Sequence, residues 1–204
     1  PDVFVLGMIS ALFAAGAWLL IASALGWPVS TTHSIIGAII GFALVAVGTD
    51  AVTWSKVGGI VGSWIITPLL SGIIAYFIFM SSQRLIFDTA EPLKNAKRFV
   101  PIYMGLAGFV MSLVTIKKGL KHIGINMGAV EGYLLSIAIA VLVAIIGKIV
   151  IQRLKYDPKA DKEMQFNNVE KVFGVLMILT AACMAFAHGS NDVANAIGPL
   201  AAVV

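Results

Sequence analysis

The sequence predicts an all-α, polytopic transmembrane helical protein with broken or re-entrant helices. Hydrophobic residues make up 59% of the chain and charged residues only 12%, and the mean hydropathy is +0.97, far outside the range of soluble domains. Several apolar runs are long enough to cross a bilayer as helices, which satisfy their own backbone hydrogen bonds in lipid. A further apolar run is shorter and begins with four hydrogen-bonding side chains.

Four apolar segments are predicted to span the membrane, and the third of them is short. They are residues 3–25, 57–80, 100–116 and 133–151. A further apolar run, residues 172–187, ends at a polar cluster. Residues 27–48 are different, because only about fourteen of them are cleanly apolar, which is typical of a half-length or re-entrant helix. Non-helical backbone at membrane depth is stable only inside protein or beside a wet cavity.

Lysine and arginine are unevenly shared among the segments between the spans. Residues 80–100 hold four of them and residues 148–171 hold six, whereas residues 117–131 hold three and residues 49–56 hold one. If the spans between them cross, the two most basic segments lie on one side, which the positive-inside rule makes cytoplasmic. These charges account for the sequence pI near 9.3, so no nucleic-acid partner is expected.

The first polar segment is P-V-S-T-T-H, residues 28–33. Pro28 suits a turn ahead of a helix, and Ser30, Thr31 or Thr32 could each be its N-cap. A helix N-terminus offers free backbone N–H groups and a partial positive charge, and neighbouring hydroxyls complete a cradle for an oxyanion. The alternative is that these hydroxyls only bond to helix carbonyls or to neighbouring spans.

Three other residues of this segment have less specific interpretations. His33 is either a hydrogen-bonded structural histidine or a ligand or proton carrier. Gly37 and Gly41 form a G-x-x-x-G pair, for which close helix packing is the favoured interpretation.

The second polar segment is H-G-S-N-D-V-A-N, residues 188–195, where Asn191, Asp192 and Asn195 share a helix face. Gly189 permits the helix to unwind, and Pro199 prevents a regular continuation of its hydrogen bonds. Asp192 is the one acidic residue inside a predicted apolar segment. Its placement costs at least about 2.5–3.5 kcal/mol, so a functional role is the default hypothesis.

The chemistry of the second segment favours a hard cation. Carboxylate, amide and carbonyl oxygens suit Na⁺, whereas no Cys or multiple-His pattern indicates zinc. We therefore assign Asp192, Asn195 and Ser190 to a cation site, with sodium bound through Asp192, and keep His188 as a further candidate. A proton-bearing or structural Asp192 stays an alternative. Because neither segment contains Lys or Arg, a bound oxyanion would need an accompanying cation.

Together the two segments resemble the PiT inorganic phosphate transporters. The hallmark of that family is the pair G-A-N-D-V-A-N-A and P-V-S-T-T-H, present once in each half of an inverted-repeat membrane protein. This chain has P-V-S-T-T-H-S-I-I-G-A at 28–38 and H-G-S-N-D-V-A-N-A-I-G-P at 188–199, with Ser190 in place of the common alanine. The resemblance implies three parts: the later part of the first repeat (1–83), connecting spans (84–171) and the beginning of the second repeat (172–204).

The resemblance also implies cation-coupled symport of inorganic phosphate by alternating access, with no enzymatic activity. Ser30, Thr31 and Thr32 are expected to hold phosphate at a hairpin tip with Asn191, while Asp192 serves the cation with Asn195 close by. No cofactor is expected besides the coupling ion, Na⁺ or H⁺. A passive anion channel, a transporter of another oxyanion such as sulfate, and a non-transporting membrane subunit are the alternatives.

The expected setting is a lipid bilayer. We expect a multi-pass integral protein of the plasma (inner) membrane, whose partners are inorganic phosphate, Na⁺ or H⁺, and lipid. A homodimer is considered as its assembly.

Overall fold

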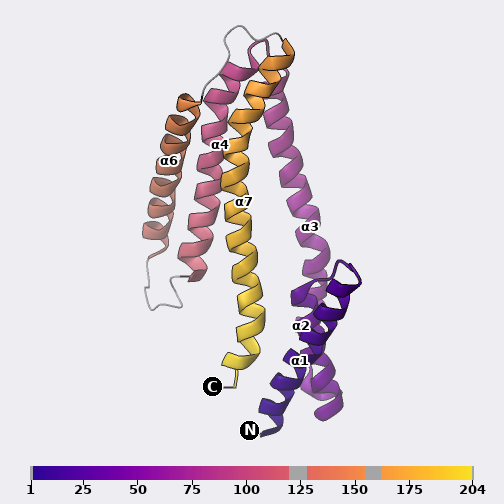
Figure 1. The fold of residues 1–204 in the computed structure, drawn as a ribbon. Helices are drawn as coiled ribbons and strands as arrows, with labels where there is room; N and C mark the ends of the chain where they lie inside the picture. The colour runs from indigo at the N-terminus through magenta and orange to yellow at the C-terminus, as the bar shows by residue number, and fades with distance from the viewer. Residues whose placement is uncertain (1, 120–127, 155–161, 204) are drawn as a thin grey trace. The chain divides into compact units, whose positions relative to one another are not determined.

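The computed structural model describes residues 2–119, 128–154 and 162–203 (Figure 1). Within these ranges the regular structure is helical and contains no strand, as predicted. The chain forms two compact units: unit 1 is Pro1–Leu70 with Phe186–Val204, and unit 2 is Ser71–Ala185. Two long helices, α3 (Trp54–Ser82) and α7 (Lys162–Ala201), contribute residues to both.

Five of the described helices are long and apolar enough to cross a membrane. They cover Asp2–Ala24, Trp54–Phe87, Pro92–Lys117, Ala129–Arg153 and Asn167–Ala201, which confirms the positions of the predicted spans. The expectation of a short third span was wrong. Pro92 is accommodated in the first turn of α4 (Pro92–Val114), where its missing N–H costs nothing, so the helix begins eight residues before the apolar run.

Unit 1 contains a helical hairpin made by α1 (Asp2–Ala24) and α2 (Thr31–Ala46). Helix α1 ends at Ala24, and Gly26 follows with a φ of +70°, the left-handed conformation that glycine adopts most easily. The N–H of Trp27 donates to the carbonyl of Ala22 at 2.8 Å, and that of Gly26 to Ser23 at 3.2 Å, which is a Schellman motif. The chain therefore reverses here, and α2 folds back along α1.

The two helices of the hairpin approach each other closely at Gly7, where the ring of Phe42 occupies the space that a Cβ atom would need. By contrast, the expectation that Gly37 and Gly41 allow close packing is wrong for the described part of the chain. A Cβ atom at either glycine would meet no described atom within 4 Å. The two helices of the hairpin therefore pack closely at Gly7 of α1 and not at the G-x-x-x-G pair of α2.

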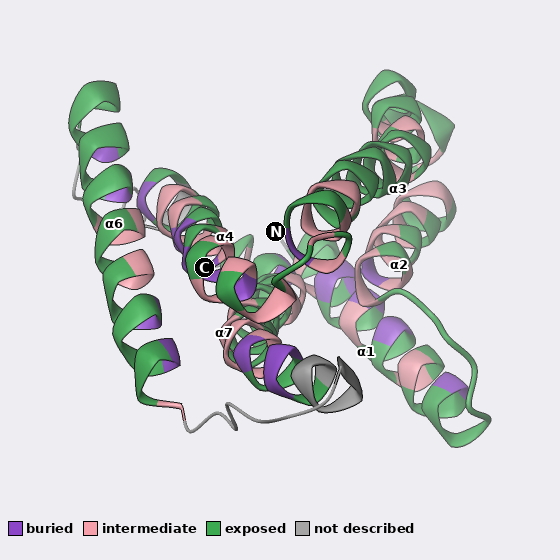
Figure 2. Ribbon diagram, turned by 90° about the horizontal axis from the view of Figure 1, so that it is seen from above, coloured by how far each residue is buried: buried purple, intermediate pink, exposed green. Residues whose placement is uncertain are grey.

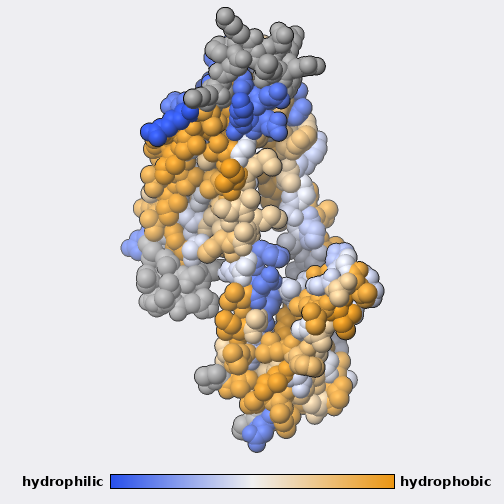
Figure 3. Space-filling model, viewed as in Figure 1, coloured by the Kyte–Doolittle hydropathy of each residue, from blue (hydrophilic) through white to orange (hydrophobic). Residues whose placement is uncertain are grey.

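Unit 2 is built around α4 and α6 (Ala129–Arg153), with α7 packed at one end. Small residues bring α4 and α6 together, since a Cβ atom at Gly105 would lie 3.1 Å from the Ala140 carbonyl oxygen. The buried positions of these two helices face each other in Figure 2. Most other faces are exposed, and Figure 3 shows them to be largely hydrophobic, as lipid-facing surfaces are.

A buried core marks the end of unit 2 at which the two basic segments lie. It joins the turn after α3, the first half of α4, the end of α6 and the first described part of α7, through Ile86, Val100, Ile151, Val169 and Val172. Described residues of both basic segments therefore meet in this core, which agrees with the expectation that the segments lie on one side of the membrane. Assignment of that side to the cytoplasm stays a prediction.

The contact at Gly7 gives a test of the hairpin. Replacing Gly7 with Val should destabilise the protein by about 1–3 kcal/mol, because the new side chain overlaps the Phe42 ring. Replacing Gly16 with Val on the same helix is the matched control, since its Cβ meets nothing within 4 Å. Thermal unfolding of the detergent-solubilised protein should show a lower midpoint for Gly7→Val than for Gly16→Val. Equal midpoints would contradict the packing.

Candidate functional site

The first turn of α2 is organised by Ser30. This residue is extended, with φ −93° and ψ 125°, and its Oγ accepts a hydrogen bond from the backbone N–H of His33 at 3.3 Å. Ser30, rather than Thr31 or Thr32, is therefore the N-cap. The backbone N–H groups of Thr31 and Thr32 have no acceptor within the helix, as is usual for a first turn, and the positive end of the helix dipole lies there.

Helix α7 is regular throughout the second polar segment. It is continuous from Lys162 to Ala201, so the predicted unwinding at Gly189 was wrong. A helical glycine costs only roughly 0.5–1 kcal/mol, which is less than leaving backbone groups unbonded in lipid. Pro199 still has a local effect, because it has no N–H to donate to the carbonyl of Asn195.

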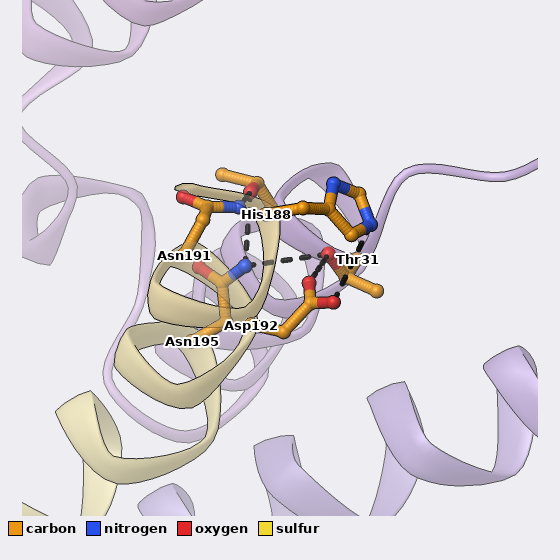
Figure 4. Close-up of polar contacts among 6 residues, drawn as sticks. Thr31, His188, Asn191, Asp192 and Asn195 are labelled. Atoms are coloured by element: carbon orange, nitrogen blue, oxygen red, sulfur yellow. Dashed lines mark hydrogen bonds and ion pairs between the residues drawn. The ribbon is translucent and has the colours of Figure 1, made fainter. Parts of the chain in front are cut away.

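Side chains from α2 and α7 meet within unit 1, and Figure 4 shows the contacts. The hydroxyl of Thr31 donates to Oδ1 of Asp192 at 2.8 Å. The amide of Asn195 donates to Oγ1 of Thr32 at 2.9 Å and to Oγ1 of Thr31 at 3.3 Å, and the amide of Asn191 donates to Thr32 at 3.1 Å. We call these five residues, Thr31, Thr32, Asn191, Asp192 and Asn195, the polar cluster.

The hydrogen-bond pattern leaves specific groups of the polar cluster free to bind. The hydroxyl of Thr32 accepts two amide N–H bonds, while its own proton has no acceptor among the described residues. Asp192 uses Oδ1 for Thr31, and its side chain remains 40% exposed. Its Oδ2 lies 3.5 Å from Nε2 of His188, one helical turn earlier. Donors for an anion thus lie beside oxygen acceptors for a cation.

Five of the residues predicted for the site are therefore brought together, and His188 joins them through Asp192. Ser30 lies next to the cluster in the sequence and caps α2. Ser190 is exposed and makes no side-chain hydrogen bond with α2 in the part of the chain that the structure describes. His33 is turned to α3, where its ring stacks on Trp64 with centroids 3.7 Å apart and an interplanar angle of 30°.

Trp64 is the neighbour of this region that sequence reasoning missed. It lies inside an apolar span, where a tryptophan carries no specific signal. Its half-buried position recurs with Val57 and Ile60 at helical spacing, whereas Ile65 and Ile66 on the same helix are exposed. In the sequence these positions are all apolar, so the inner face of α3 carries no signal that could have identified Trp64.

Among the described residues, no group of three or more His, Cys, Asp or Glu side chains gathers in a way that could hold a metal ion. A cation at the polar cluster would therefore depend on one carboxylate together with hydroxyl, amide and backbone carbonyl oxygens. Such oxygens are the ligand type that hard cations use.

A model of the phosphate transporter family matches residues 1–204, the full length of the chain. The chain belongs to the phosphate transporter family. It is thus an integral, multi-pass membrane protein of a family of transporters rather than of enzymes, as the resemblance implied.

Individual members of the phosphate transporter family agree with this assignment. The chain is 56% identical over 204 residues to a protein of Haemophilus influenzae named as a phosphate permease, and 40% identical over 203 residues to one of Pyrococcus abyssi. A solved structure, described as the sodium-dependent phosphate transporter, is similar along 100% of the chain, with 40% identity and a TM-score of 0.89. The chain spans 48% of the length of each of these three proteins, about half.

The capping hydrogen bond can be tested separately from any transport. Replacing Ser30 with Ala should destabilise the first turn of α2 by about 1 kcal/mol, because the N–H of His33 loses its acceptor. Amide exchange of His33 and Ser34, the first bonded amides of α2, should become faster. Ser10→Ala is the control, since the Ser10 hydroxyl only donates to the Leu6 carbonyl within α1. Unchanged exchange in Ser30→Ala would mean that Ser30 is not the cap.

Proposed function

We propose that the complete protein containing this chain transports inorganic phosphate across the plasma (inner) membrane together with a cation, Na⁺ or H⁺, by alternating access. The observation that supports this most directly is the polar cluster, which places the N-terminus of α2 against the carboxylate of Asp192. Membership of the phosphate transporter family supports phosphate as the substrate. The description of the similar solved structure as sodium-dependent favours Na⁺.

In this proposal phosphate binds at the first turn of α2. The free N–H groups of Thr31 and Thr32 and the helix dipole attract an oxyanion, and the Thr32 hydroxyl proton is a further donor. Ser30 contributes in the same place, because its Oγ accepts a bond from His33 and keeps its own proton to donate. Asn191 positions the Thr32 hydroxyl by donating to it.

The cation is proposed to bind on the α7 side of the polar cluster. Asp192 supplies the negative charge, and Asn195, one helical turn later on the same face, supplies a further oxygen ligand. A role for Ser190 in this site rests on the sequence pattern alone.

Coupling to a cation has an energetic reason. Moving one negative charge into a cell against 100 mV, negative inside, costs about 2.3 kcal/mol. Phosphate carries at least one such charge, and the polar cluster contains no Lys or Arg to offset it. Cations that enter with phosphate cancel or reverse this cost, and they also lower the repulsion between phosphate and Asp192.

The arrangement of the complete protein is part of the same proposal. Residues 1–83 would end the first inverted repeat, residues 84–171 would connect, and residues 172–204 would begin the second. In inverted-repeat transporters, substrate sites lie at the interface of the repeats. A homodimer in the lipid bilayer is the assembly to be tested with it.

The phosphate side of the proposal predicts the effect of removing one hydroxyl. Replacing Thr32 with Val should raise the phosphate KM about tenfold or more, because a hydrogen bond to a charged group is lost at nearly constant shape. The measurement is uptake of labelled phosphate by the full-length protein in proteoliposomes. Thr180→Val is the matched control, since that hydroxyl bonds only to carbonyls of its own helix. An unchanged KM in Thr32→Val would remove the α2 turn from the phosphate site.

The cation side predicts the effect of removing one charge. Replacing Asp192 with Asn should abolish or sharply weaken the dependence of phosphate uptake on a Na⁺ or H⁺ gradient, because the site loses its one carboxylate. Asp50→Asn makes the same charge change at an exposed position outside the polar cluster and should leave the dependence intact. Gradient-independent flux in the wild-type protein would instead indicate a passive channel.

A further inference from the structure

We propose that Trp64 is a positioning residue for phosphate binding: by stacking on His33, it holds the first turn of α2 in place from the side of α3. This inference deepens the proposed function and rests on it for its transport readout. It concerns a residue of an apolar span that lies outside both sequence motifs.

The stack joins two helices of unit 1 at close range. The ring centroids of His33 and Trp64 lie 3.7 Å apart, with an interplanar angle of 30°. Offset and tilted arrangements of aromatic rings at such distances are attractive beyond the area that they bury. Trp64 is half-buried by this contact, whereas its neighbour Ile65 is 70% exposed. The indole therefore lies on the inner face of α3.

The position of His33 connects the stack to the binding residues. His33 directly follows Thr32, and its backbone N–H is the group that Ser30 caps. Because successive side chains on a helix are about 100° apart, Thr31, Thr32 and His33 cannot all point to one neighbour. Thr31 and Thr32 are bonded to α7, and His33 is stacked on α3. The first turn of α2 is thus held from two directions.

Contacts with both α7 and α3 stabilise the first turn of α2. The helix has 16 residues, and its first two backbone N–H groups are without internal acceptors, so its first turn is a part of the helix that frays easily. Fraying would move the N–H groups and the Thr32 hydroxyl that are proposed to bind phosphate. Loss of the stack should therefore weaken phosphate binding without touching any group that contacts phosphate.

The test uses substitutions at Trp64 in the full-length protein, reconstituted in proteoliposomes. Trp64→Ala should raise the phosphate KM about three- to tenfold while the maximal rate changes less than twofold. Trp64→Phe keeps an aromatic ring and should restore a KM near that of wild type. Ile65→Ala, a truncation at the next position on the exposed face of α3, is the control and should leave the KM unchanged. Equal effects of Trp64→Ala and Trp64→Phe, or of Trp64→Ala and Ile65→Ala, would overturn the proposal.

A double substitution tests whether the two rings act through each other. If Trp64 acts through His33, then His33→Ala combined with Trp64→Ala should raise the KM no further than the larger single substitution does. Multiplying effects of the two substitutions would show that they act independently and would overturn the proposal.

Amide exchange provides a readout that does not involve phosphate. In Trp64→Ala the hydrogen-bonded amides of His33 and Ser34 should exchange about three- to tenfold faster than in Trp64→Phe, while those of residues 39–46 should not change. Unchanged exchange at His33 and Ser34 would overturn the positioning role. If the wild-type protein takes up no phosphate, the proposed function fails, and the exchange comparison still decides whether Trp64 holds α2.

Discussion

The hydrogen bond between Thr31 and Asp192 is the contact on which the polar cluster depends. It joins residues 161 positions apart in the sequence. A carboxylate inside an apolar helix is costly, and that cost falls when hydroxyl and amide groups replace water around it. The amide of Asn195 extends the contact by donating to Thr31 and Thr32, and the amide of Asn191 donates to Thr32. Five polar side chains are thereby brought together in a chain that is otherwise strongly apolar.

The two helices that supply the polar cluster contribute in different ways. α7 is long and uninterrupted, so Asn191, Asp192 and Asn195 project from a rigid support at fixed helical spacing. α2 is short and presents its beginning, where backbone N–H groups and a dipole are available. An intact helix thus provides the carboxylate and the two amides, and a helix end provides unpaired backbone donors. Rigid elements hold binding groups more accurately than loops do.

Other contacts of unit 1 serve to keep the end of α2 where it is. The Schellman motif at Gly26 reverses the chain, and Phe42 packs on Gly7 to hold α2 along α1. At the first turn, Ser30 caps the backbone and His33 stacks on Trp64. Backbone reversal, helix packing, capping and ring stacking thus all act on one short helix.

The sequence by itself determined the all-α membrane class, the positions of the spans and the face shared by Asn191, Asp192 and Asn195. These follow from hydropathy and from the helical repeat, which are local properties. It also placed the N-cap within three residues, but not on Ser30, because all three hydroxyls can cap. The sequence-based prediction began α4 too late and expected α7 to unwind at Gly189, and both expectations were wrong. Both helices continue because an unfavourable residue in a helix costs less than unbonded backbone groups in lipid.

Only the tertiary structure decided which partners these residues have. That Thr31 donates to Asp192, that Asn195 reaches both threonines, and that His33 turns to Trp64 depend on how α2, α3 and α7 pack. Gly37 and Gly41 illustrate the same limit, because spacing predicted close packing and the contact is instead at Gly7. Helical periodicity fixes which side chains share a face, whereas the helix opposite that face is set by long-range packing.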